Sequence, residues 1–130
     1  MTFELMCLVG MTAFFLLAWI PTSMAKSQAW GMAWLNSNRN EKGLPPLPEW
    51  GDRASHAYEN LKSNFPGFAV AILVLVILGR HDAGIEIAAG IYVVARLAHF
   101  AIYIAGLVAP RTITWAIGLV ANLYLLVRAF

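Results

Sequence analysis

The chain has 130 residues, of which 60% are hydrophobic and only 12% charged, and its net charge is +2. Soluble domains carry roughly 25% charged residues, so this composition excludes an ordinary soluble protein and predicts an integral membrane protein. The small positive excess gives no argument for nucleic acid as a partner. Since each helical span needs about 20 residues, four spans fill nearly the whole chain, and we expect one domain over residues 1–130 with the lipid bilayer as its partner.

The first predicted span covers about residues 3–20. The sequence TSMA at 22–25 resembles the cleavage site of a signal peptide, but the amino-terminal region, MTFEL, contains Glu4 and no basic residue, which favours a permanent helix. Cys7 is the only cysteine, so neither an internal disulfide nor a cysteine metal cluster can form. Its apolar surroundings disfavour the thiolate, and we predict no reactive role for it and no metal site.

A polar connection follows at about 26–51. It contains NSNRNEKG and then PPLPEWG, whose three prolines prevent a continuous helix. Trp30, Trp34 and Trp50 suit the level of the membrane interface.

Three further helices are predicted at about 52–79, 85–108 and 112–129. Asp52 is a good residue to cap the second helix, and Pro66 marks a point where that helix can kink. The polar turn RHDAG separates the second helix from the third, and APRT separates the third from the fourth. The expected fold is therefore an all-α integral membrane protein, a bundle of four transmembrane helices.

Four spans place both termini on one side of the membrane. On the opposite side we expect most of the basic residues, namely Lys26, Arg39, Lys42, Arg53 and Arg111, against Arg80 and Arg128 on the side of the termini. The positive-inside rule then predicts that the long connection is cytoplasmic and the termini are outside, which is the periplasm for a bacterial inner membrane.

The segment RASHAYENLKSNFP carries a polar stripe into the second predicted span. At helical spacing one face holds Arg53, His56, Asn60 and Ser63 or Asn64. One interpretation is a solvated first turn above the membrane, which we favour for Glu59 and Lys62. For the deeper asparagines we favour a face that looks at protein, water or a ligand.

The third predicted helix repeats this pattern with Arg96, His99 and Tyr103 at i, i+3 and i+7. An arginine within a span costs on the order of 3 kcal/mol, so Arg96 is expected to face the bundle interior and find partners there. A structural ion pair or interhelical hydrogen bond for Arg96, and a satisfied core histidine at His99, are the alternatives to a ligand site. Together with the stripe on the second helix, the three residues suggest a cavity wall.

Arg111 is predicted at the start of the fourth helix, where unsatisfied amides already make the potential positive. It is badly placed to stabilise that helix, which favours an anion site, with a surface arginine that snorkels to the interface as the alternative. Guanidinium groups bind carboxylates through paired hydrogen bonds, and a cation beside a thiol favours its thiolate. A small anionic ligand that enters from the cytoplasm would suit these stripes.

These residues resemble the MAPEG family, the membrane-associated proteins in eicosanoid and glutathione metabolism. The family motif reads roughly R-A-x-x-A-x-x-N-x-x-E-x-x-P, and Arg53, Ala54, Ala57, Asn60 and Pro66 match it in register. A second signature, R-x-x-[HY]-x-x-x-Y followed by R-[ST], is matched by Arg96, His99 and Tyr103, and then by Arg111 and Thr112.

The resemblance implies a homotrimer that binds glutathione between neighbouring subunits near the cytoplasmic face. It implies that Arg111 is the catalytic residue, which would stabilise the glutathione thiolate. The residues that it implies for glutathione binding are Arg53, His56, Asn60, Ser63, Arg96, His99 and Tyr103.

The chain departs from the family pattern at two of these positions. Ser63 replaces the motif glutamate, which in catalytic members meets the amino group of the glutamyl arm, and His56 replaces a frequent arginine. Each loss could remove about 1 to 3 kcal/mol of binding, roughly tenfold or more in affinity.

Three functions follow from this sequence. The leading hypothesis is a glutathione transferase or peroxidase that acts on a lipophilic small molecule entering from the lipid. The first alternative is a trimeric MAPEG scaffold without efficient glutathione chemistry, which Ser63 favours. The second is a small multidrug exporter, which would need a carboxylate deep in a span; Glu4 and Glu86 both lie near predicted span ends, which disfavours it.

Overall fold

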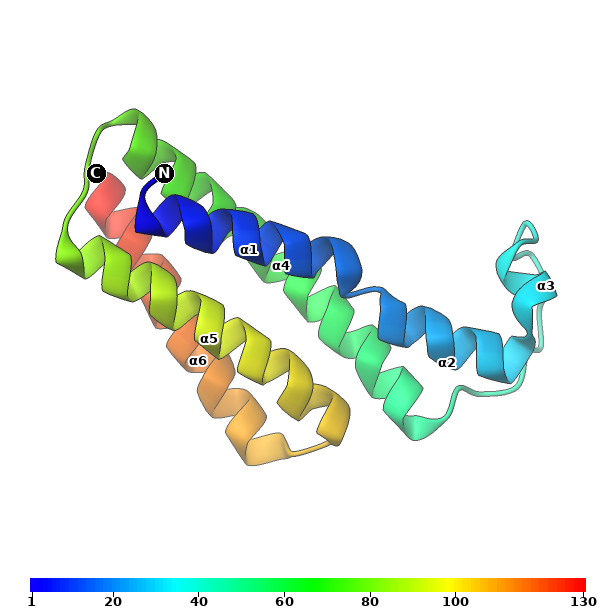
Figure 1. Ribbon diagram of the computed structural model, residues 1–130. Helices are drawn as coiled ribbons and strands as arrows, with labels where there is room; N and C mark the ends of the chain where they lie inside the picture. Colours follow the sequence, from blue (N-terminus) through cyan, green and yellow to red (C-terminus); the bar gives the residue numbers. More distant parts are fainter.

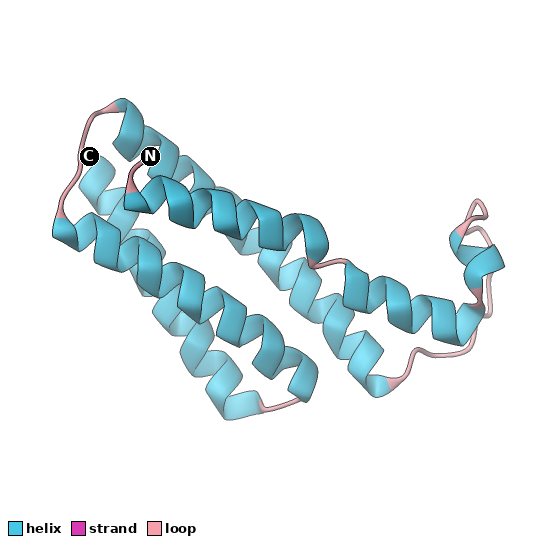
Figure 2. Ribbon diagram, viewed as in Figure 1, coloured by secondary structure: helices cyan, strands magenta, loops and turns pink.

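The computed structural model describes residues 1–130 and is entirely helical apart from its connections (Figures 1 and 2). The helices are α1 Phe3–Leu17, α2 Ile20–Trp30, α3 Met32–Leu35, α4 Glu49–Ile77, α5 Ala83–Ala105 and α6 Val108–Ala129. Four helical segments are long and apolar enough to cross a membrane: Phe3–Trp30, which combines α1 and α2, and then α4, α5 and α6. The predicted all-α class with four membrane helices is therefore confirmed.

The first span is longer than predicted, because helix resumes after a short break at Ala18 and Trp19. Pro21 lies in the first turn of α2, where its missing N–H costs nothing. The first part of the predicted polar connection at 26–51 is consequently helical, since α2 extends to Trp30 and the single turn α3 follows. A Cβ on Gly51 would lie only 2.3 Å from Ala25 Cβ, so glycine permits the close approach of α2 to α4.

Helix α4 begins three residues earlier than predicted. Pro48 has an extended backbone at the N-cap position, and Asp52 lies inside the helix instead of capping it. The helix runs without interruption through Pro66 to Ile77.

The predicted boundaries between the last two helices, at 108 and 112, are wrong. Helix α5 begins at Ala83, where Asp82 accepts a hydrogen bond from the Ile85 amide at 3.0 Å, and it ends at Gly106, whose φ of 83° is left-handed. Helix α6 then starts at Val108 with Pro110 in its first turn. Glycine ends helices in this conformation, and proline is tolerated in a first turn, which explains both differences.

Helices α5 and α6 form a hairpin that packs against α4, and α1 and α2 follow α4 along its length (Figure 1). Both termini lie at one end of the bundle, and α3 and the α5–α6 turn lie toward the other (Figure 1). The buried core includes Phe68 of α4 stacked on Tyr92 of α5, with ring centres 4.0 Å apart. At the end of the termini, the fully buried Glu4 pairs with His81 and Asp82 pairs with Arg128.

Candidate functional site

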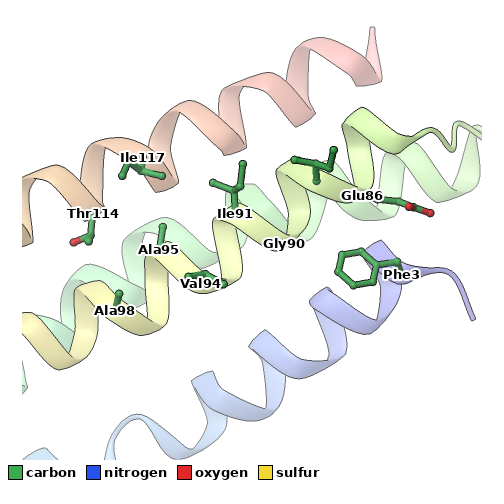
Figure 3. A pocket seen from close by; sticks show the side chains of 10 residues that line it. Phe3, Glu86, Gly90, Ile91, Val94, Ala95, Ala98, Thr114 and Ile117 are labelled. Atoms are coloured by element: carbon green, nitrogen blue, oxygen red, sulfur yellow. The ribbon is translucent and has the colours of Figure 1, made fainter.

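Helices α4, α5 and α6 form a pocket of about 250 Å³, which we call the recess. Its lining consists of Asn60, His99, Tyr103, Arg111, Thr112 and Trp115. Larger grooves of about 580 and 530 Å³ run along α5 and α6, the first of them shown in Figure 3, but neither has a basic residue in its wall. The recess is the place where the two predicted polar stripes meet.

Arg111 lies one turn inside α6, and its backbone amide donates a hydrogen bond to the Leu107 carbonyl at 3.4 Å. It therefore does not lie among the free amides at the helix start, where it was predicted. Its guanidinium carbon is 4.6 Å from the centre of the Tyr103 ring, and the group forms no ion pair with a carboxylate. The aromatic face holds a cation whose charge is free to meet an anion.

His99 is only 4% exposed, and its Nδ1 lies 3.0 Å from the backbone carbonyl of Arg111. A carbonyl can only accept, so the Nδ1–H donates and Nε2 is left as the acceptor. This buried Nε2 has no partner in the protein. A buried acceptor without a partner costs about 1 to 3 kcal/mol, which a donor group on a bound ligand would relieve.

Arg96 is 2% exposed and faces the bundle interior, as predicted. Its Nη2 donates to Asn64 Oδ1 at 3.0 Å, its Nη1 lies 3.5 Å from Asn60 Oδ1, and its guanidinium carbon is 5.3 Å from the Tyr92 ring centre. The partners are neutral amides, so the predicted alternative of interhelical hydrogen bonds describes this contact and an ion pair does not. Through Asn60, Arg96 places a second positive charge directly behind the recess.

Arg53 and His56 lie beside the recess but do not line it. Arg53 Nε donates to the Ile104 carbonyl at 2.8 Å, so the side chain caps the last turn of α5. His56 is 61% exposed, lies 3.5 Å from Asp52 and has its ring centre 6.5 Å from that of Tyr103. Arg53, the first residue of the family motif, therefore stabilises the end of α5 within the single chain.

Ser63 lies outside the recess and is exposed. Its hydroxyl donates to the Glu59 carbonyl of the preceding turn at 3.0 Å. Glu59 and Lys62 are also exposed and pair with each other at 2.9 Å.

Three contributors were missed from the sequence as site residues. Thr112 and Trp115 line the recess, and the Thr114 hydroxyl lies 3.5 Å from His99 Nδ1. Trp115 follows Arg111 by four residues and therefore shares its helical face. A prediction that began this helix at Val108 would have placed these side chains beside Arg111.

Four helices long and apolar enough to cross a membrane, three of which line a polar recess, define a small multi-pass helical membrane protein. The model of the MAPEG family matches residues 3–130, and the chain belongs to this family. No curated protein and no solved structure matched the chain in the corresponding comparisons. Members of the MAPEG family include glutathione transferases and peroxidases as well as proteins with other functions.

Proposed function

We propose that this protein is a glutathione-dependent transferase or peroxidase that acts on lipophilic electrophiles or hydroperoxides in the membrane. The observation that carries the proposal is the free guanidinium of Arg111 beside the unpartnered Nε2 of His99, in a recess whose wall contains no carboxylate. Arg96 lies behind the same wall and also lacks a carboxylate partner. Glutathione is an anion with a thiol that becomes reactive as the thiolate, which suits a site of this charge.

Arg111 would act by stabilising the glutathione thiolate. A positive charge near a thiol lowers the free energy of its deprotonated form and so raises the fraction of the nucleophile at neutral pH. In the transferase reaction the thiolate sulfur forms a bond to an electrophilic carbon of the substrate, while a leaving group departs from that carbon with its bonding pair or, in an addition, the π pair of a double bond moves to the neighbouring atom, which is then protonated. In the peroxidase reaction the thiolate attacks the terminal oxygen of a hydroperoxide, the O–O bond breaks, the other oxygen leaves as an alcohol after protonation, and the sulfur becomes a sulfenic acid. The thiol of a second glutathione then displaces water from this sulfenic acid and forms the disulfide.

The recess of one chain is small for this ligand. Binding sites for small molecules usually have volumes of about 300 to 1,000 Å³, and the recess has about 250 Å³. We therefore include a homotrimer in the proposal, as the family resemblance implies, with the neighbouring chain supplying the second wall. Arg53, His56 and Ser63 would then line the enlarged site from its rim.

The proposed location is the cytoplasmic side of a bacterial inner membrane. The recess lies in the half of the bundle that contains the α5–α6 turn, away from the termini (Figure 1). The positive-inside rule assigns that half to the cytoplasm. A lipophilic substrate would approach from the bilayer past Trp115, which is 36% exposed.

A non-catalytic trimeric scaffold is the second candidate. It is favoured by the exposed Ser63, whose hydroxyl donates its hydrogen bond to the Glu59 carbonyl of the same helix, and by the absence of a charged side chain at this motif position. Without the carboxylate, the amino group of glutathione loses a partner on α4.

Calorimetric titration of reduced glutathione into the detergent-purified protein tests the proposal, together with the absorbance difference of the bound thiolate. We expect saturable binding and a thiolate signal that Arg111→Ala abolishes. Lys42→Ala is the matched control, because it removes the same charge from the exposed loop and should change neither measurement. No binding at millimolar glutathione would reject the enzyme and leave the scaffold.

A further inference from the structure

A further pocket lies at the end of the first span that we propose to be cytoplasmic, where α2 meets α3. Gly31 joins the two helices with φ 85° and ψ 160°, a conformation that is essentially restricted to glycine. At this residue α3 turns away from the line of α2 (Figure 1). The angle between them encloses a pocket of about 410 Å³, which we call the corner groove.

The corner groove is lined by both apolar and polar side chains. Its apolar lining includes Trp19, Met24 and Met32, which are 47%, 52% and 63% exposed. Its polar lining includes Ser27 and Arg39. A ligand that fills this pocket must itself have an apolar part and a polar part.

Arg39 is the cation in the lining of the corner groove. Its Nε and Nη2 donate to the Leu35 carbonyl at 3.4 and 3.2 Å, and its guanidinium carbon lies 5.9 Å from the Trp34 ring centre. Its backbone has a φ of 59°, and it is the only residue other than glycine with positive φ. No carboxylate pairs with Arg39, and Nη1 makes no hydrogen bond within the protein.

The corner groove lies at the membrane boundary. The first span has 28 residues, which corresponds to about 42 Å of helix against about 30 Å of hydrocarbon. The C-terminal part of α2 therefore extends beyond the hydrocarbon into the headgroup layer. Trp30 and Trp34, with ring centres 4.4 Å apart, provide the aromatic pair typical of that layer.

We propose that the corner groove binds one anionic phospholipid, with the phosphate on Arg39 and an acyl chain against Trp19 and Met24. The opposite charges of Glu41 and Lys42 in the neighbouring loop cancel, so the net charge beside the groove is the positive charge of Arg39. An anionic lipid matches this pocket, because its phosphate can meet the cation at the level of the headgroups and its acyl chain can lie against the apolar side chains in the hydrocarbon layer. The site is separate from the proposed glutathione site, since Arg39 is not part of the recess.

The experiment titrates the full-length protein in detergent with phosphatidylglycerol or phosphatidylcholine of identical chains and counts bound lipids by native mass spectrometry. We expect saturable binding of one phosphatidylglycerol per chain. Arg39→Asn should weaken it about tenfold, because it removes a charge-assisted contact while asparagine still tolerates the left-handed backbone. Lys42→Asn is the matched control and should change the affinity less than about twofold.

Equal losses in the two variants would indicate attraction by bulk charge, and no loss in Arg39→Asn would show that Arg39 does not hold the phosphate; either result would overturn the site. Glycerol phosphate distinguishes a lipid from a free phosphate. If it binds as tightly as the phospholipid, or if Met24→Ser leaves lipid binding unchanged, the acyl chain contributes nothing and the lipid proposal fails. Unchanged circular dichroism and thermal unfolding of each variant would exclude misfolding as the cause of any loss.

Discussion

Arg96 of α5 donates to Asn64 of α4 at 3.0 Å, and this contact joins the two helices across the buried middle of the bundle without a carboxylate. The guanidinium is 2% exposed, so the charge has been removed from both water and lipid headgroups. Its stabilisation comes from amide dipoles and from the Tyr92 ring. The arrangement keeps the charge of Arg96 uncompensated within the protein.

A double-mutant cycle on this pair should show strong coupling. Asn64→Ala leaves a buried charge with one amide partner fewer, and we expect it to destabilise the protein by about 2 to 4 kcal/mol. Arg96→Met removes the charge itself at similar volume, so Asn64→Ala should cost much less in that background. Thermal unfolding in detergent measures all four proteins, and additive losses would contradict the pairing.

Gly118 of α6 makes room for the same guanidinium. A Cβ at this position would lie 3.0 Å from Arg96 Nε and 3.2 Å from its Cζ. We expect Gly118→Ala to displace Arg96 and to cost about 1 to 3 kcal/mol of unfolding free energy. Gly10→Ala is the matched control, because a Cβ there would meet nothing within 4 Å and alanine favours the helix of α1. Equal melting temperatures of the two variants would contradict the crowding around Arg96.

The role of Gly118 also shows what the sequence could and could not predict. Hydropathy and helical spacing predict four spans and place Arg96, His99 and Tyr103 on one face, because both depend only on local periodicity. The partners of Arg96 depend on the register and rotation of α4 and α6 against α5, which no local pattern encodes. Arg53 is a second example, since its bond to the Ile104 carbonyl requires two helices to meet.

The wrong helix boundaries have a different cause, because the residues that determine them can be identified in the sequence itself. Gly106 in a left-handed conformation ends α5, and Pro110 is accommodated in the first turn of α6. The sequence prediction placed the break at the proline and did not assign the end of the helix to Gly106. The consequence reached the candidate site, because Trp115 was left out of the wall around Arg111.

The pair of Glu4 and His81 joins the start of α1 to the turn between α4 and α5. The Glu4 side chain is 1% exposed, and its Oε2 has no hydrogen-bond partner. We expect His81→Ala to cost about 1 to 3 kcal/mol, because it leaves a buried carboxylate without its partner. In the Glu4→Gln background the same substitution should cost less, and thermal unfolding of the four variants provides the measurement. An equal cost in both backgrounds would assign the loss to packing of the His81 ring.

Ser63 provides a gain-of-function test of the proposed glutathione site. If a neighbouring chain completes the site, Ser63→Glu restores a carboxylate at the motif position that meets the glutamyl amino group in catalytic members of the family. A hydrogen bond to a charged group contributes about 1.5 to 3 kcal/mol, so we expect the affinity for glutathione to rise about tenfold or more. Calorimetry on the trimer-sized fraction of the purified protein makes the measurement.

Ser63→Gln separates charge from size, because glutamine has nearly the same shape as glutamate without its negative charge. We expect it to bind glutathione no more than about twofold better than the wild type. Ser63 is exposed and its hydroxyl bonds only its own helix, so neither substitution should change thermal stability by more than about 0.5 kcal/mol. Equal affinities of all three proteins would place the ligand away from this face of α4. Improved binding by Ser63→Glu alone would mean that the natural chain retains the pocket but has lost one of its contacts.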